Sequence, residues 1–167
     1  RPDTGYVYFG DKENNYFAWL VSQPCAEVEG SFSFKGTVYE AKGKGYHDHN
    51  WGNVDMSKVI NHWYWCRTTI GEYTIIANDI IPEKKYGYKR IPIVLISKDG
   101  KECNNENEKI IIKRADTEEH FLTGKSIDNK LIFIKENDDN ISYKVEFLRE
   151  NDIFTSSLVD VIGLSKI

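Results

Sequence analysis

The chain has 167 residues, enough for one domain with a hydrophobic core and too few for two domains of ordinary size. Hydrophobic residues make up 40% of it, charged residues 29% and aromatic residues 13%, which fits a soluble globular protein rich in β structure. The net charge of −4, with Lys and Arg matched by nearby Asp and Glu, argues against nucleic-acid binding. No apolar run approaches the roughly 20 residues of a membrane span, so we expect none.

The three cysteines are Cys25, Cys66 and Cys103, and they form no CxxC pair. An odd set without that spacing indicates neither a disulfide framework nor a thiolate metal site. We therefore expect reduced thiols and a cytoplasmic location. The chain opens on Arg1, and residues 5–9 already have the pattern of a strand, so we expect a processed or excised part of a longer protein.

Short apolar segments with a period of two residues, broken by Gly, Asn and Asp, run through the chain. This alternation is typical of strands with one buried and one solvent-facing side. Pro24 is expected to end the second strand, and Gly43 and Gly45 to mark a bulge or a close backbone approach. The predicted strands are residues 6–9, 16–21, 26–34, 37–41, 60–68, 73–81, 91–96, 109–114, 120–123, 131–135, 141–148 and 154–161.

This succession of short strands also limits the architecture. About ten or more of them in one domain indicate a sandwich or a closed barrel. A barrel has no free edges, and its interior can hold a ligand. We therefore predict an all-β fold, an antiparallel β-barrel. Residues 53–59 are expected to form a loop or one short helical turn.

Residues 42–53 and 60–67 contain three of the four His and three of the four Trp residues. Aromatic rings together with imidazole, carboxylate and amide groups are typical of an apolar ligand pocket with a few placed polar groups. If residues 45–51 are extended, two sets of side chains point to opposite sides of the strand. One set is His47, His49 and Trp51, and the other is Tyr46, Asp48 and Asn50.

These polar residues have alternative interpretations. His47 and His49, with His62 downstream, have a spacing seen in three-His zinc sites. Either His could instead cap a buried carbonyl or lie at the surface, and Asp48 could be a residue that stabilises a turn. Cys66 beside Arg67 suggests an activated thiolate, but a buried small hydrophobic residue is the simpler interpretation because no His is placed as its base.

The hairpin of residues 60–81 places a carboxylate among apolar residues. With a turn centred near residues 70–71, Asp79 lies opposite His62 or Trp63. Poor solvation there favours the protonated carboxyl group and keeps a proton available for general acid catalysis, unless Arg67 or a charged His reverses the effect. The alternative for Asp79 is a strand-end carboxylate that reaches solvent or a loop N–H group.

The two runs together resemble a known family. Residues 45–53, with the sequence GYHDHNWGN, then 62–67 (HWYWCR) and 71–77 (GEYTIIA) are similar to the family of carotenoid 1,2-hydratase (hydroxyneurosporene synthase), kievitone hydratase and AttH-like proteins, to which fungal decalin-forming Diels–Alderases are related. The similarity covers residues from about 5 to about 100. It implies two lipocalin-like (calycin) β-barrels in tandem, of which this chain is the second, with residues 1–45 as lead-in strands and 46–167 as the barrel.

The resemblance also implies an enzyme that hydrates or cyclises a carbon–carbon double bond of an apolar, isoprenoid-like or polyketide-like substrate. Asp79 matches the proton donor proposed in the hydratases, and Ala77 stands where a Tyr is expected. Asp48 is the second candidate acid, and His49 or His62 would orient the acid or activate water. The expected substrate-binding residues are Trp51, Trp63, Trp65, Tyr46, Tyr64 and Arg67, with the Trp faces stabilising a carbocation.

We expect no cofactor and no metal. Apart from the substrate, the partner expected is a first lipocalin-like domain that this chain lacks. Two alternatives stay open. One is a non-catalytic lipocalin-type carrier of an apolar small molecule, and the other is a zinc enzyme.

Overall fold

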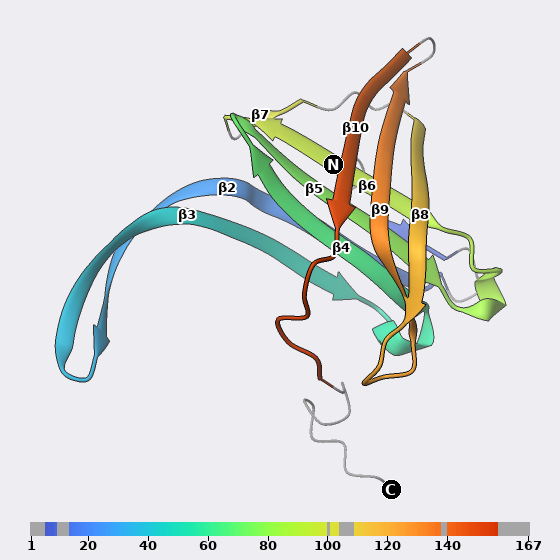
Figure 1. Cartoon of the computed structure of the whole chain (residues 1–167), viewed down its shortest axis with the longest axis horizontal. Helices are drawn as coiled ribbons and strands as arrows, with labels where there is room; N and C mark the ends of the chain where they lie inside the picture. The colour runs from blue at the N-terminus through green and yellow to red at the C-terminus, as the bar shows by residue number, and fades with distance from the viewer. Residues whose placement is uncertain (1–5, 10–13, 100, 104–108, 138–139, 157–167) are drawn as a thin grey trace, which may run out of the picture. The chain divides into compact units, whose positions relative to one another are not determined.

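Antiparallel strand pairing determines how the chain folds in the computed structural model, which describes residues 6–9, 14–99, 101–103, 109–137 and 140–156 (Figure 1). The strand order is β1-β2-β3 in one sheet, β4-β5-β6-β7 in a second and β10-β9-β8 in a third. The all-β prediction is confirmed, and these sheets are compatible with a lipocalin-like fold. The strand pairing of the described residues gives three open sheets and does not join them into one closed barrel.

The chain divides into two compact units, Arg1–Ile112 with Phe133–Val145, and Lys113–Ile132 with Glu146–Ile167. The first unit holds the strands β1 (Tyr6–Tyr8), β2 (Tyr16–Phe34), β3 (Thr37–Gly52), β4 (Ile60–Ile70), β5 (Tyr73–Pro82), β6 (Ile91–Lys98) and β7 (Lys101–Glu102), and the short 3-10 helices η2 (Met56–Lys58) and η3 (Lys84–Tyr86). The remaining strands are β8 (Lys109–Glu119), β9 (Ser126–Asn137) and β10 (Asn140–Leu148). None of the described residues forms a helix long and apolar enough to cross a membrane. The one-domain prediction stays a prediction.

The β2–β3 hairpin is a long, curved two-stranded ribbon (Figure 1). The prediction that Pro24 ends a strand is wrong, because shifts of register between Val21 and Gln23 and between Gln23 and Ala26 let β2 continue past it. β3 likewise runs through Gly43 and Gly45 and crosses the boundary expected at residue 45. A Cβ atom at Gly45 would lie 2.6 Å from the side-chain atom Val28 Cγ2, and one at Gly43 would have no neighbour within 4 Å, so neither glycine marks a close backbone approach. A shift of register does lie beside Gly45, between Gln23 and Ala26 of β2.

The outer part of this ribbon has two chemically different faces. Val28, Phe32 and Phe34 alternate along β2 on one face, and Tyr39 of β3 stacks on Phe32 with ring centroids 5.3 Å apart. The other face carries the ion pairs Lys42–Glu29 and Lys44–Glu27. Both faces are exposed.

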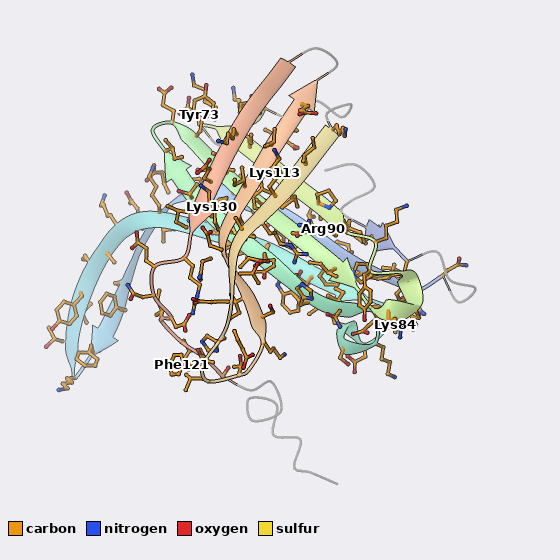
Figure 2. The ribbon with its side chains drawn as sticks, turned by 45° about the vertical axis from the view of Figure 1, so that its right-hand side comes forward. Tyr73, Lys84, Arg90, Lys113, Phe121 and Lys130 are labelled. Atoms are coloured by element: carbon orange, nitrogen blue, oxygen red, sulfur yellow. The ribbon has the colours of Figure 1, made fainter. Side chains whose placement is uncertain are left out.

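The β4–β5 hairpin turns over two residues, since Ile70 pairs with Tyr73 and Gly71 takes a φ of +59° (Tyr73 is labelled in Figure 2). Its register therefore differs from the prediction. Asp79 lies opposite Tyr64, and not opposite His62 or Trp63. The turn is centred between Gly71 and Glu72, later than the predicted centre at residues 70–71, and this moves the partner of Asp79 by one residue from Trp63 or by two from His62. A shift of one residue changes which side chains share a face.

Trp19 lies in the core of the first unit, where it is 2% exposed. Every residue of β5 from Thr74 to Pro82 is buried, as expected for a central strand. The residues of this core are Val7, Trp19, Val59, Ile60, Ile76, Ile80, Ile93 and Leu95.

The second unit contains a polar cluster around a turn. Both ring nitrogens of His120 are hydrogen-bonded: Nδ1 lies 3.0 Å from Thr123 Oγ1, and Nε2 lies 2.6 Å from Asp152 Oδ2. Arg149 donates to the same Asp152. The strand predicted for residues 120–123 is wrong, because this segment is the turn that carries Phe121 (Figure 2). Residues 154–156 form no strand, and 157–161 lie outside the described residues.

Candidate functional site

A cavity of about 310 Å³ lies where β2 and β3 face β4 and β5 in the first unit. Strand alternation supplies its walls, since Phe17 and Trp19 point the same way from β2, and Trp63 and Trp65 point the same way from β4. The lining residues are Phe17, Trp19, Asp48, Asn50, Met56, Ile60, Trp63, Trp65, Asn78 and Ile80. This wall is mostly apolar and has three polar side chains, the pattern of a site for an apolar small molecule.

Asp48 is the one carboxylate in this wall among the described residues. Its Oδ2 atom accepts two hydrogen bonds of 2.7 Å, one from Trp19 Nε1 and one from the Tyr46 hydroxyl. No hydrogen bond joins the other oxygen, Oδ1, to a described residue. One oxygen of the carboxyl group is thus held by two donors of the protein, and the other by no donor of the described residues.

Tyr46 links Asp48 to a cation. Burial, and then the hydrogen bond to Asp48, raise the pKa of Tyr46 well above the usual value for tyrosine, so its hydroxyl stays protonated and donates. The Arg67 guanidinium lies 5.3 Å from the centre of the Tyr46 ring, a cation–π contact, and also donates to the Pro24 carbonyl oxygen. Tyr46 and Trp65 are neighbours, with ring centroids 5.5 Å apart. Tyr46 is therefore in contact with the Asp48 carboxylate, the Trp65 indole and the Arg67 guanidinium.

Trp63 and Trp65 form the open side of the cavity. They are 49% and 43% exposed, whereas Trp19 behind them is almost fully buried. The prediction that Trp63 and Trp65 share a face while Tyr64 takes the other is confirmed. A flat apolar ligand can therefore reach these two indole rings from solvent.

Asp79 is fully buried, but the structure does not bring it to the cavity. It points to the opposite face of β5 from Asn78 and Ile80, which line the cavity. Arg90, which precedes β6, donates to both carboxylate oxygens of Asp79 (Arg90 is labelled in Figure 2). Its Nε atom donates to Oδ1 at 3.0 Å, and its Nη2 atom donates to Oδ2. This geometry describes a buried ion pair, and a proton donor to a ligand in this cavity would have to come from elsewhere.

The predicted separation of the GYHDHNWGN run into two faces is confirmed, because Asp48 and Asn50 line the cavity and the alternate residues do not. His49 stacks on Trp51 with ring centroids 5.3 Å apart, and Trp51 Nε1 donates to the Tyr6 hydroxyl at 3.3 Å. His47 Nδ1 lies 2.6 Å from Ser22 Oγ.

His62 is also away from the cavity, edge-on to the Tyr64 ring with centroids 6.0 Å apart, and its Nδ1 lies 2.8 Å from Asn61 Oδ1. In the part of the chain that the structure describes, no three His, Cys, Asp or Glu side chains gather as a metal site. Of the predicted site residues, the structure brings together Asp48, Tyr46, Trp63, Trp65 and Arg67, and leaves out Asp79, His49, His62, Trp51 and Tyr64.

Trp19 and Asn78 belong to the cavity although the sequence did not point to them. Trp19 reads as an ordinary core residue of a hairpin strand, and only strand pairing places it beside Asp48. Asn78 had a visible signal, because an amide among isoleucines and alanine in a buried strand needs a hydrogen-bond partner.

Comparison with protein families decides what kind of protein this is. A family model described as Diels-Alderase-like matches residues 10–154. The chain belongs to the Diels-Alderase-like family. The similarity seen in residues 5–100 is thus confirmed and extends over β8, β9 and β10. No solved structure matches the chain significantly.

Three curated relatives share shorter segments with this member of the family. The hydroxyneurosporene dehydrogenase of Chlorobaculum tepidum is 46% identical over 56 residues, which are 30% of this chain and 15% of that protein. The quinolone epoxide rearrangement protein asqO of Emericella nidulans is 33% identical over 60 residues, 36% of this chain and 16% of its own. The quinolone epoxide rearrangement protein penF of Penicillium thymicola is 29% identical over 80 residues, 48% of this chain and 21% of its own. The matched segments thus span about a fifth or less of these relatives.

Proposed function

We propose that this chain is an enzyme that holds an apolar small molecule against Trp63 and Trp65 and uses Asp48 as its acid–base group. The observation that carries the proposal is the Asp48 carboxyl group, which lines a largely apolar cavity and has its Oδ2 atom held by Trp19 and Tyr46. General acid–base catalysis needs such a group within reach of the substrate.

The step that fits this arrangement is proton transfer to a carbon–carbon double bond. The protonated Asp48 gives its proton to one alkene carbon, the π electrons form the new C–H bond, and the neighbouring carbon becomes a cation. The faces of Trp63 and Trp65 stabilise the cation. The Trp19 and Tyr46 donors stabilise the carboxylate that remains.

Two outcomes complete the reaction. Water adds to the cation and returns a proton to Asp48, which is hydration. Alternatively a second double bond attacks the cation, a ring closes, and a proton from the neighbouring carbon returns to Asp48. The half-exposed Trp63 and Trp65 admit water, which favours hydration.

The relatives support an apolar substrate class and leave the reaction open. One name refers to a dehydrogenase of hydroxyneurosporene, and the other to the rearrangement of a quinolone epoxide. An isoprenoid-like or polyketide-like substrate is therefore our proposal for this chain. We also propose that the whole protein has a first lipocalin-like domain and that its activity is the one proposed here.

Incubation with isoprenoid and polyketide alkenes in deuterated water tests the acid step. Protonation by Asp48 places solvent deuterium on carbon, and mass spectrometry detects it in the product. The Asp48→Asn variant should lose deuterium incorporation but still show saturable changes in Trp fluorescence with the same alkene. Unchanged incorporation in Asp48→Asn would overturn the role of Asp48.

A non-catalytic carrier is the second candidate, favoured by the open and mostly apolar cavity. A carrier binds the alkenes, with saturable changes in Trp fluorescence, and yields no deuterated product with either the original chain or Asp48→Asn.

A further inference from the structure

Asn78 is a polar side chain that the protein leaves unpaired at the cavity wall. It lines the cavity from the middle of β5 and is only 5% exposed. Its side-chain oxygen is buried and has no hydrogen-bond partner among the described residues. Buried polar atoms in native proteins are nearly always hydrogen-bonded, so each exception needs an explanation.

The neighbours of Asn78 cannot supply that bond. Ile76 and Ile80 flank it on the same face of β5, and Trp65 lies opposite it on β4. The indole N–H group of Trp19, which also lines the cavity, is already donated to Asp48. The side chains that flank and oppose the amide are therefore apolar or aromatic, and the amide borders the cavity.

We infer that Asn78 is a specificity-determining residue that accepts a hydrogen bond from an O–H or N–H group of the bound molecule. The ligand is then an apolar molecule with one hydroxyl or amide N–H group, and not a pure hydrocarbon. This inference rests on the proposed function, because it assigns a role within the same cavity. Asp48 and Asn78 then have different roles, since Asp48 acts on the reacting carbon and Asn78 fixes the orientation of the ligand.

Two isomeric monoterpenoids provide the test, because α-terpineol carries a hydroxyl group and cineole only an ether oxygen. Both are titrated into the full chain while Trp fluorescence is recorded. We expect α-terpineol to bind about tenfold more tightly than cineole, since an ether leaves the buried amide oxygen unpaired. In Asn78→Leu the preference should fall to within about twofold.

Ser97→Ala is the matched control. Ser97 Oγ is the other buried side-chain atom without a hydrogen-bond partner among the described residues, but Ser97 does not line the cavity. This variant should keep the preference for α-terpineol. A preference that survives in Asn78→Leu, or that disappears equally in Ser97→Ala, overturns the inference.

The comparison of the two ligands on the unmodified chain keeps the inference testable if Asn78→Leu does not fold. Equal binding of α-terpineol and cineole refutes the role of Asn78 and leaves the proposed cavity function standing. Failure of both compounds to bind refutes the proposed function, and the inference with it.

Discussion

The indole of Trp19 donates a hydrogen bond of 2.7 Å to the carboxylate of Asp48, from β2 to the neighbouring strand β3. Trp19 is part of the hydrophobic core, so the core and the polar group of the cavity share one contact. Asp48 therefore contributes to stability as well as to the proposed chemistry.

Replacement of Asp48 by Ala should lower the free energy of unfolding by about 1–3 kcal/mol, because it removes the acceptor of the buried Trp19 N–H group. Asp48→Asn keeps an acceptor oxygen in the same place and should lose less. Urea unfolding followed by circular dichroism measures both variants. Equal stability of Asp48→Ala and the unmodified chain would mean that this hydrogen bond is not formed in solution.

Tyr46 makes stability depend on pH in the alkaline range. Its pKa in the folded chain is raised, first by burial and then by Asp48, so the unfolded chain loses this proton at a lower pH than the folded chain. The stabilising contribution is complete below pH of about 10, the usual tyrosine pKa, and is lost as pH rises through the pKa of the folded residue.

Tyr46→Phe isolates this effect from the other titrating groups. The free energy of unfolding of the unmodified chain should fall more steeply above pH of about 10 than that of Tyr46→Phe. Urea unfolding at a series of pH values measures the difference. Parallel pH profiles for the two proteins would contradict the assignment.

The ion pair of Asp79 and Arg90 should respond unequally to removal of its two partners. The Arg90 side chain is 32% exposed and that of Asp79 is 0% exposed, so only Arg90 can be solvated by water when its partner is removed. Arg90→Met leaves a buried, unpaired carboxylate and should lower the free energy of unfolding by about 3–5 kcal/mol. Asp79→Asn should lower it by about 1–2 kcal/mol.

The double variant provides the control. Asp79→Asn combined with Arg90→Met removes the unpaired charge and should be more stable than Arg90→Met alone. Urea unfolding of the three variants decides the matter. If Asp79→Asn lowered the free energy of unfolding the most, Arg90 and not Asp79 would be the partner that cannot reach water.

Cys66 should be a slow nucleophile. Burial raises the pKa of its thiol to about 11, so very little thiolate is present near neutral pH. At pH of about 8, iodoacetamide should modify Cys66 at least about tenfold more slowly in the folded chain than in the urea-unfolded chain. Mass spectrometry of the peptide that contains Cys66 gives both rates. Equal rates would show that the thiol is not shielded.

The sequence alone predicted the faces of the strands well. The two-residue period is a fixed property of extended backbone, so Asp48 could be separated from His49, and Trp63 and Trp65 from Tyr64, without knowledge of the fold. The all-β class followed from the same alternation. Pairing between strands was harder, because the register depends on where the turn is centred, and the turn lies at Gly71-Glu72, later in the chain than expected.

That difference of register matters most for Asp79. Pairing with Trp63, one of the two predicted partners, would have placed this carboxylate on the cavity face, but Asp79 lies opposite Tyr64 and is paired with Arg90, which stands in a loop with no recognisable pattern. Asn78, one residue earlier, faces the cavity instead. Contacts between residues far apart in the sequence decide such roles, and single-strand patterns do not contain them.

The central claim is that the cavity beside Asp48 is the ligand site. Photo-crosslinking with an apolar alkyl diazirine tests this claim most directly. The labelled chain is digested, and the modified residues are located by mass spectrometry with and without competing α-terpineol. We expect labels on β3 around Asp48 and on β4 around Trp63 and Trp65, reduced by α-terpineol. Labelling confined to the exposed apolar face of the β2–β3 ribbon at Phe32 and Phe34, and unaffected by α-terpineol, would contradict it.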